Sequence, residues 1–156
     1  MKFIILSFSQ IAQPFGHLLY TDTLDFRPLC NWITINNPES NIWEIGQPNK
    51  GEFNATHSGR LSIITDSTSM YKSNLNDYFS ITIPCSENYF GEGILSFYHK
   101  YESDTLIDGG IIEVSYNNGA DWKNIRDDKN HVTTNFVGLY NDTIKDGIHG
   151  FSGSSK

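Results

Sequence analysis

The sequence predicts an all-β fold, an antiparallel β-sandwich. Aromatic residues make up 13% of the 156-residue chain, and such residues are favoured in strands. Short segments in which apolar and polar residues alternate recur along the chain. Clusters of Gly, Pro, Asn and Ser separate these segments, as expected of turns between antiparallel strands. The length suits one domain with a sizeable core.

Seven segments are predicted as strands. They are 17–26, 31–35, 41–46, 60–65, 78–84, 93–102 and 109–116. Segment 46–59 is rich in Gly, Pro and Asn without any period, so it is predicted as a loop. The Asn and Ser content of 69–80 allows one short helical turn at most. The Gly/Ser-rich tail 147–156 is predicted as coil.

The N-terminal segment 1–16 has two alternative interpretations. Lys2 is followed by a short apolar run over 3–8, which is typical either of the remnant of a secretory signal or of a first strand. The predicted β-sandwich domain covers residues 17–156. Its cysteines, Cys30 and Cys85, either form one disulfide in an oxidising compartment or stay as two buried thiols.

Charge and hydropathy narrow the range of partners. The net charge is −7 and no basic cluster is present, which argues against nucleic acid, because its phosphates need a face of Lys and Arg. No apolar run approaches the roughly 20 residues of a membrane helix, so no transmembrane segment is predicted. Neutral ligands, cations and protein partners stay open.

The segment from Ser115 to Trp122, SYNNGADW, predicts a tight hairpin. Asn118-Gly119 is a strong hairpin signal, since a type I′ turn needs positive φ at both central residues. The spacing Ser115, Asn117, Gly119, Trp122 resembles the Asp-box hairpin, with Asn117 where Asp is usual. In that motif polar side chains bond the turn backbone and the Trp packs beneath it. We therefore predict a structural role for the hairpin.

The order of motifs along residues 20–154 resembles the MAM-like jelly-roll modules of secreted bacterial multidomain proteins. The residues that carry the resemblance are Trp43, Gly46, Pro48, Ser58, Gly59, Pro84, Leu95, Phe97, His99, Asp108, Gly109, Gly110, Ser115, Gly119 and Trp122. The resemblance implies a β-sandwich of jelly-roll type. Animal MAM domains carry four cysteines and this chain has two, so their disulfide pattern does not transfer.

The same resemblance implies strands beyond residues 150–155, GFSGSS, whereas the chain ends at Lys156. We therefore expect a jelly roll that lacks its last strands and belongs to a longer parent chain with neighbouring domains. The isolated chain is then expected to present an open sheet edge, with marginal stability or association as the result.

No catalytic motif is found, and the chain is predicted not to be an enzyme. None of the five histidines lies in an HExxH motif, and no GxSxG or phosphate-binding glycine loop is present. We expect a non-catalytic accessory or adhesion module of a secreted or cell-surface protein, which contacts a glycan or a surface protein. The alternative is a non-catalytic fragment of a secreted protease or glycosidase whose active site lies elsewhere.

Two kinds of ligand site have candidate residues. A structural calcium ion is the one cofactor predicted, with oxygen ligands from Asp22, Asp25 and Asp108, although turn bonding explains aspartates in such loops equally well. Sugar stacking is the second, on large rings that could also be core residues. The candidate rings are those of Trp32, Trp43, Tyr98 and Tyr101.

Overall fold

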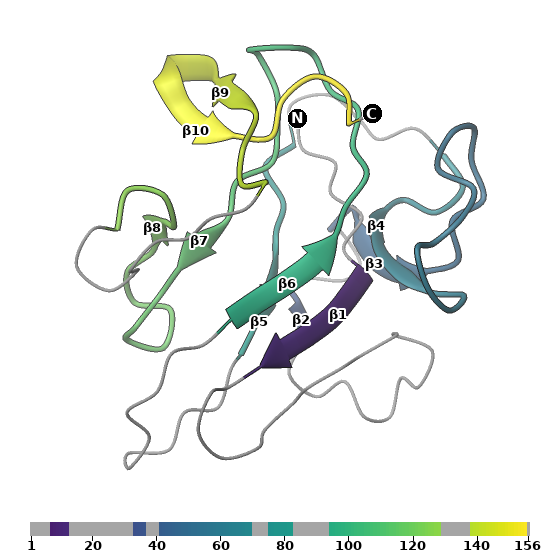
Figure 1. Cartoon of the computed structure of the whole chain (residues 1–156), viewed down its shortest axis with the longest axis horizontal. Coiled ribbons are helices and arrows are strands. Elements are labelled where there is room, and N and C mark those ends of the chain that lie inside the picture. The colour runs from purple at the N-terminus through teal and green to yellow at the C-terminus, as the bar shows by residue number, and fades with distance from the viewer. Residues whose placement is uncertain are drawn as a thin grey trace. The chain divides into compact units, whose positions relative to one another are not determined.

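The structure is a computed structural model that describes residues 7–12, 33–36, 41–69, 75–82, 94–128 and 138–155 (Figure 1). These residues form strands in small antiparallel sheets and no α-helix, which confirms the all-β prediction. The chain divides into two compact units. Ile4–Lys100 form the N-terminal unit, and Tyr101–Lys156, with Met1–Phe3, form the C-terminal unit.

The described residues of the N-terminal unit form three antiparallel strand pairs. They are β1 (Ser7–Ala12) with β6 (Ile94–Tyr98), β2 (Ile33–Ile35) with β5 (Phe79–Ile81), and β3 (Trp43–Gly46) with β4 (Ser62–Thr65). A β-bulge between Phe8 and Gln10 interrupts the ladder of β1 and β6. Residues 7–12 thus form a strand, one of the two alternatives for the N-terminal segment. The predicted strand 17–26 lies outside the described residues.

The core of the N-terminal unit is centred on β4, whose four residues are all buried. Ile63 and Ile64, adjacent on this strand, point to opposite faces, so apolar cover is present on both. Across the ladder Trp43 is paired with Thr65 and only 4% exposed. Its ring meets that of Phe79 edge-on, with centroids 5.0 Å apart, so β3 packs against β5.

One amide side chain joins the ends of three strands in this unit. Asn41 Nδ2 donates to the carbonyls of Asn36 (2.7 Å) and Tyr78 (2.8 Å), and its Oδ1 accepts from the Trp43 amide (2.9 Å). These residues flank β2, β5 and β3. The Trp43 indole N–H donates to the Asp77 carbonyl (3.1 Å), which adds a second link between the start of β3 and the approach to β5.

In the described part of the C-terminal unit, the chain forms two short hairpins and an aromatic core. β7 (Glu113–Val114) pairs with β8 (Lys123–Asn124), and β9 (Asp142–Ile144) pairs with β10 (Ile148–Gly150) around a 3₁₀ turn, η2 (Lys145–Gly147). Phe151 lies between Tyr101 and Tyr140, with ring centroids 5.5 and 5.0 Å away. All three rings are buried and form the core of this unit.

The tail does not follow the coil prediction. Residues 148–150 form β10, and Phe151, Ser152 and Gly153 are buried. The amide of Phe151 donates to the Gly110 carbonyl (2.8 Å), and the amide of Gly110 donates back (2.9 Å). A Cβ on Gly109 would lie 2.2 Å from the Phe151 oxygen. The small residues here permit close approach of the two backbone segments. A Gly/Ser-rich composition is equally typical of a flexible segment, so composition alone did not indicate this packing.

The predicted strand 109–116 is shorter than expected, because only Glu113 and Val114 are in β7. The backbone of Ile112 is satisfied in another way. Its amide donates to the hydroxyl of Tyr140 (2.7 Å), and its carbonyl accepts from that hydroxyl (3.0 Å) and from the Ile125 amide (3.0 Å). Gly110 is bridged to Phe151, so the start of the segment bonds to the tail and not to another strand of a sheet.

Candidate functional site

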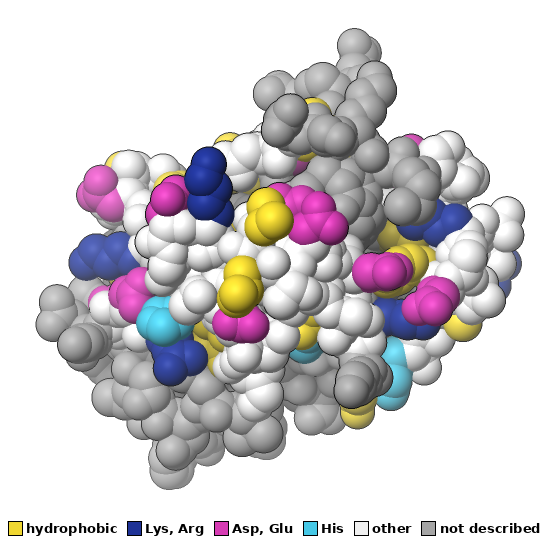
Figure 2. All heavy atoms as spheres, turned by 90° about the horizontal axis from the view of Figure 1, so that it is seen from above, with side chains coloured by type: hydrophobic (Ala, Val, Ile, Leu, Met, Phe, Trp, Pro, Cys, Tyr) yellow, Lys and Arg dark blue, Asp and Glu magenta, His cyan; other side chains and the backbone are white. Residues whose placement is uncertain are grey.

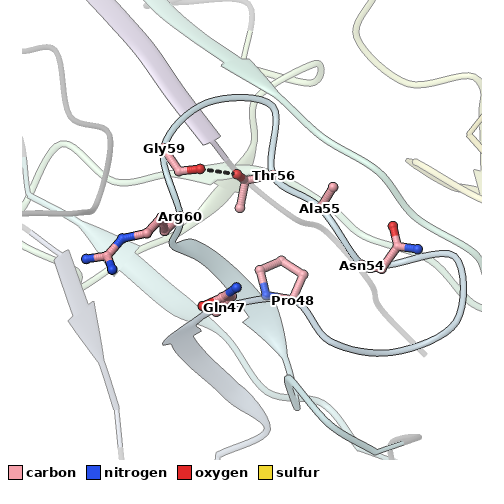
Figure 3. Close-up of a pocket in the computed structure, with 7 residues that line it drawn as sticks. All are labelled: Gln47, Pro48, Asn54, Ala55, Thr56, Gly59 and Arg60. Carbon is pink, nitrogen blue, oxygen red and sulfur yellow. Dashed lines mark hydrogen bonds between the residues drawn. The ribbon is translucent and has the colours of Figure 1, made fainter.

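A pocket of about 250 Å³ lies in the loop that joins β3 to β4 (Figure 3). Seven residues line it: Gln47, Pro48, Asn54, Ala55, Thr56, Gly59 and Arg60. Figure 3 shows Gln47 and Pro48 on one arm of the loop, facing the arm that carries Ala55 and Thr56. The side chain of Arg60 extends away from Pro48.

A tight turn and one buried ring give the loop its shape. The Phe53 amide donates to the Lys50 carbonyl (2.7 Å), which closes a turn in which Gly51 has φ 43°. Gly51 suits this left-handed position because it has no Cβ. Phe53 is buried and packs against Ile64 of β4. The middle of the loop is therefore anchored to the core by an apolar side chain.

The side chains of two lysines, Lys50 and Lys100, make hydrogen bonds that fix the same loop. Lys50 Nζ donates to the carbonyls of Thr65 and Ser69, at 2.5 and 3.0 Å. Partial burial lowers the pKa of Lys50, and the negative charges of Asp66 and Glu44 offset part of this effect. Lys100 Nζ donates to the Glu52 carbonyl and lies 5.5 Å from the centre of the Phe53 ring. These contacts order the loop that forms the pocket wall.

The second arm of the loop turns at 56–59 and carries a histidine that stacks on Tyr98. The Thr56 hydroxyl donates to the Gly59 carbonyl (2.7 Å), and Gly59 has φ 67°. The ring of His57 lies parallel to that of Tyr98, with centroids 3.4 Å apart and an interplanar angle of 8°. Tyr98 is 50% exposed. An exposed aromatic stack thus adjoins Thr56 of the pocket.

The groups around the pocket suit a neutral polar ligand. Gln47 and Asn54 are exposed amides that both donate and accept hydrogen bonds, and Thr56 adds a hydroxyl. The neighbouring aromatic stack adds exposed apolar surface, and Pro48, which lines the pocket, is itself buried. None of the seven described lining residues is a carboxylate or a thiol, so the lining provides neither a carboxylate pair nor a thiol nucleophile.

The four predicted hairpin residues are brought together in the C-terminal unit. Ser115 Oγ accepts from the Gly119 amide (2.8 Å) and Asn117 Oδ1 accepts from the Asp121 amide (2.9 Å), so both side chains bond the turn backbone. Asn118 and Gly119 have φ 56° and 85°, as a type I′ turn requires. Trp122 covers the turn, with its Nε1 donating to the Gly119 carbonyl (3.1 Å), yet it is 46% exposed.

Two of the predicted stacking rings are core residues, which corrects their assignment as ligand contacts. Trp43 is 4% exposed and Tyr101 6%, so neither offers an open face to a sugar. Trp43 is enclosed by β5, and Tyr101 packs against Phe151 of the tail. Tyr98 stays accessible beside His57. Trp32 lies outside the described residues.

The predicted calcium ligands are not assembled by the residues that the structure describes. Within these ranges no group of three or more His, Cys, Asp or Glu side chains is placed to hold a metal. The Asp108 carbonyl accepts from the hydroxyls of Ser103 (3.2 Å) and Ser152 (2.9 Å), which gives this residue a part in turn structure. Asp22 and Asp25, and both cysteines, Cys30 and Cys85, lie outside the described residues.

Charge on the surface is mixed. On the face seen in Figure 2, the described Lys and Arg side chains are interspersed with Asp and Glu and do not gather into one patch. In the parts of the chain that the structure describes, no helix has the length and apolar character needed to cross a bilayer.

Comparison with protein-family models, with curated proteins and with solved structures found no match. The resemblance to MAM-like modules therefore depends on the sequence motifs alone.

The loop pocket is the part of the site that the sequence did not indicate. Its polar residues, Gln47, Asn54, Thr56 and Arg60, follow no spacing that predicts a ligand site. The available signal was the length of the loop, since long loops on a β scaffold commonly carry function. The stack of His57 on Tyr98 joins residues 41 positions apart, and only the folded chain brings them together.

Proposed function

We propose that the chain is a non-catalytic accessory module of a secreted or cell-surface protein and that it contacts carbohydrate through the loop between β3 and β4. The observation that carries the proposal is the exposed stack of Tyr98 and His57 beside the amide- and hydroxyl-lined pocket. Sugars present apolar C–H faces and rims of hydroxyls. The half-exposed aromatic stack and the side-chain amides complement these two kinds of surface.

The jelly-roll topology belongs to the same proposal. It is supported by the order of the sequence motifs and by the all-β character of the described residues. Export of the parent protein fits the proposed surface role, and a disulfide between Cys30 and Cys85 is expected in that environment.

Replacing Tyr98 with alanine is expected to weaken glycan binding by about tenfold or more, as for an aromatic residue that dominates an interface. The measurement is a glycan array probed with the unmutated 156-residue chain, called the parent chain in the tests below, with and without calcium. Titration of the ligands found then gives their affinities. Tyr78→Ala is the matched control, because Tyr78 is an exposed tyrosine of the same unit (57%), whereas the ring that stacks on His57 is that of Tyr98.

The two tyrosine variants separate a local from a general effect. Binding that Tyr78→Ala preserves and Tyr98→Ala loses supports the proposed site. Equal losses in both variants, or a parent chain that retains no glycan, would contradict it. Turnover of a glycan or peptide by the parent chain would instead favour an enzymatic role.

Calcium is tested through thermal stability. If a structural ion binds, millimolar calcium should raise the melting temperature, because a ligand held only by the native state adds about 2.7 kcal/mol at a hundredfold excess over Kd. Asp108→Ala should remove this rise, and Asp104→Ala, in the same turn, should preserve it. The quantity compared is the shift caused by calcium in each protein. If calcium leaves the melting temperature of the parent chain unchanged, the proposed calcium site is contradicted.

A further inference from the structure

Asn118 and Gly119 form the exposed tip of the hairpin between β7 and β8. Both residues have positive φ, and the Ala120 amide donates to the Asn117 carbonyl (3.3 Å) to close the turn around them. The side chain of Asn118 is exposed. The residue that follows it has no side chain to shield its backbone nitrogen.

An asparagine followed by glycine can lose its amide without an enzyme. The Gly119 nitrogen gives up its proton to solvent base and attacks Asn118 Cγ. A C–N bond forms, the bond from Cγ to Nδ2 breaks, and ammonia leaves. The product is a cyclic imide in the main chain. Water then opens either carbonyl bond of the ring and yields an aspartyl or an isoaspartyl residue at this position.

The hairpin engages the atoms on which that reaction depends. The Gly119 N–H, whose proton must leave in the reaction, donates a hydrogen bond to Ser115 Oγ at 2.8 Å. The Gly119 carbonyl accepts from Trp122 Nε1 at 3.1 Å, and the indole ring lies 3.5 Å from the position of a Cβ on Gly119. The peptide between Asn118 and Gly119 must rotate to bring the nitrogen to Cγ. The Ser115 bond is made by this peptide and opposes the rotation directly. The Trp122 bond is made by the next peptide, between Gly119 and Ala120, and limits the movement of Gly119.

We propose that Asn118–Gly119 is a deamidation site and that the hydroxyl of Ser115, with the indole of Trp122, restrains the reaction until the hairpin opens. Deamidation and hydrogen exchange of the Gly119 amide then share one opening step. The change is one-way. Both products carry a new carboxylate three positions from Asp121. In the isoaspartyl product the main chain is also one carbon atom longer, so that product cannot re-form the original turn.

The test compares deamidation rates in the full chain at mildly alkaline pH, measured by peptide mass spectrometry. Ser115→Ala is expected to deamidate about fivefold faster, the factor that corresponds to the loss of one ordinary hydrogen bond. Ser115→Thr keeps the hydroxyl and should react at the parent rate. Ser154→Ala removes an exposed hydroxyl elsewhere in the same unit and should also leave the rate unchanged.

A second measurement keeps the test valid if Ser115→Ala unfolds. In the parent chain, urea below the unfolding transition should raise the deamidation rate and the exchange rate of the Gly119 amide in parallel. A parent rate equal to that of a free peptide spanning 113–124 would overturn the proposal. So would a Ser115→Ala protein that stays folded, exchanges the Gly119 amide faster and yet deamidates at the parent rate.

Discussion

Replacing Gly109 with alanine is expected to lower the free energy of unfolding by about 3 kcal/mol, the upper part of the range for overpacking a filled site. The added Cβ would lie 2.2 Å from the Phe151 carbonyl oxygen and 2.4 Å from Ile144 Cγ2. The oxygen cannot retreat easily, because it accepts from the Gly110 amide at 2.9 Å. The methyl group would therefore separate the tail from Gly110, and urea denaturation measures the cost.

The control for this variant is Gly147→Ala in the same unit. No atom lies within 4 Å of a Cβ at Gly147, and its φ is 74°, so only the left-handed backbone cost of about 1–2 kcal/mol applies. A larger loss at Gly109 than at Gly147 identifies the contact with Phe151 as the cause. If the free energy of unfolding of Gly109→Ala equalled or exceeded that of Gly147→Ala, the close contact between Gly109 and Phe151 would be contradicted.

The strands were the most predictable part of the fold, because alternation is a local property. Segments 41–46, 60–65 and 93–102 each contain the strand expected of them, as β3, β4 and β6. Alternation also indicates which residues share a face. It does not indicate which partner covers that face, so Trp43 and Tyr98 could not be assigned to core and surface from the sequence.

The tail shows where composition fails. Gly/Ser-rich segments usually behave as flexible chain. In 150–155, however, the small residues let the backbone pack against residues about 40–50 positions earlier in the chain. Ser152 Oγ accepts from the Leu106 amide (2.8 Å) and donates to the Asp108 carbonyl (2.9 Å). Such pairings depend on contacts distant in sequence, which no local window contains.

The candidate site was unpredictable for a related reason. The hairpin at 115–122 is defined by neighbours in sequence, and its turn residues indicated the positive φ values of Asn118 and Gly119. The pocket instead depends on the packing of Phe53 against Ile64 and on the hydrogen bonds that Lys50 and Lys100 donate to backbone carbonyls. Only the predicted loop character of 46–59 followed from its residues.

The second stability prediction concerns the hydroxyl of Tyr140 in the aromatic core of the C-terminal unit. Tyr140→Phe is expected to lower the free energy of unfolding by about 1–3 kcal/mol at neutral pH. The Ile112 amide would lose its hydrogen-bond acceptor, the Tyr140 hydroxyl at 2.7 Å. The rings of Phe151 and Tyr101 that form the neighbouring core offer no replacement acceptor at that position. The ring itself is kept, so its packing against Phe151 is unchanged.

The same hydroxyl should make the protein sensitive to alkali. Burial, together with the charges of Asp127 and Glu113, raises the pKa of Tyr140 to about 12, against about 10 for an unfolded tyrosine. The folded state therefore binds this proton more tightly than the unfolded state does. The resulting stabilisation is complete below about pH 10 and is lost as the pH rises toward about 12.

Urea denaturation of the parent chain and of Tyr140→Phe across this pH range separates the contribution of Tyr140 from the rest. The pKa of Tyr116 is also raised to about 12, by burial and by Asp128, but Tyr116 is present in both proteins. The difference between the two stability curves therefore reports Tyr140 alone. It should be largest at neutral pH and shrink as the pH approaches 12, since the buried phenolate then costs the parent chain what the hydroxyl contributed. A constant difference across the range would show that Tyr140 ionises as freely in the folded chain as in the unfolded one.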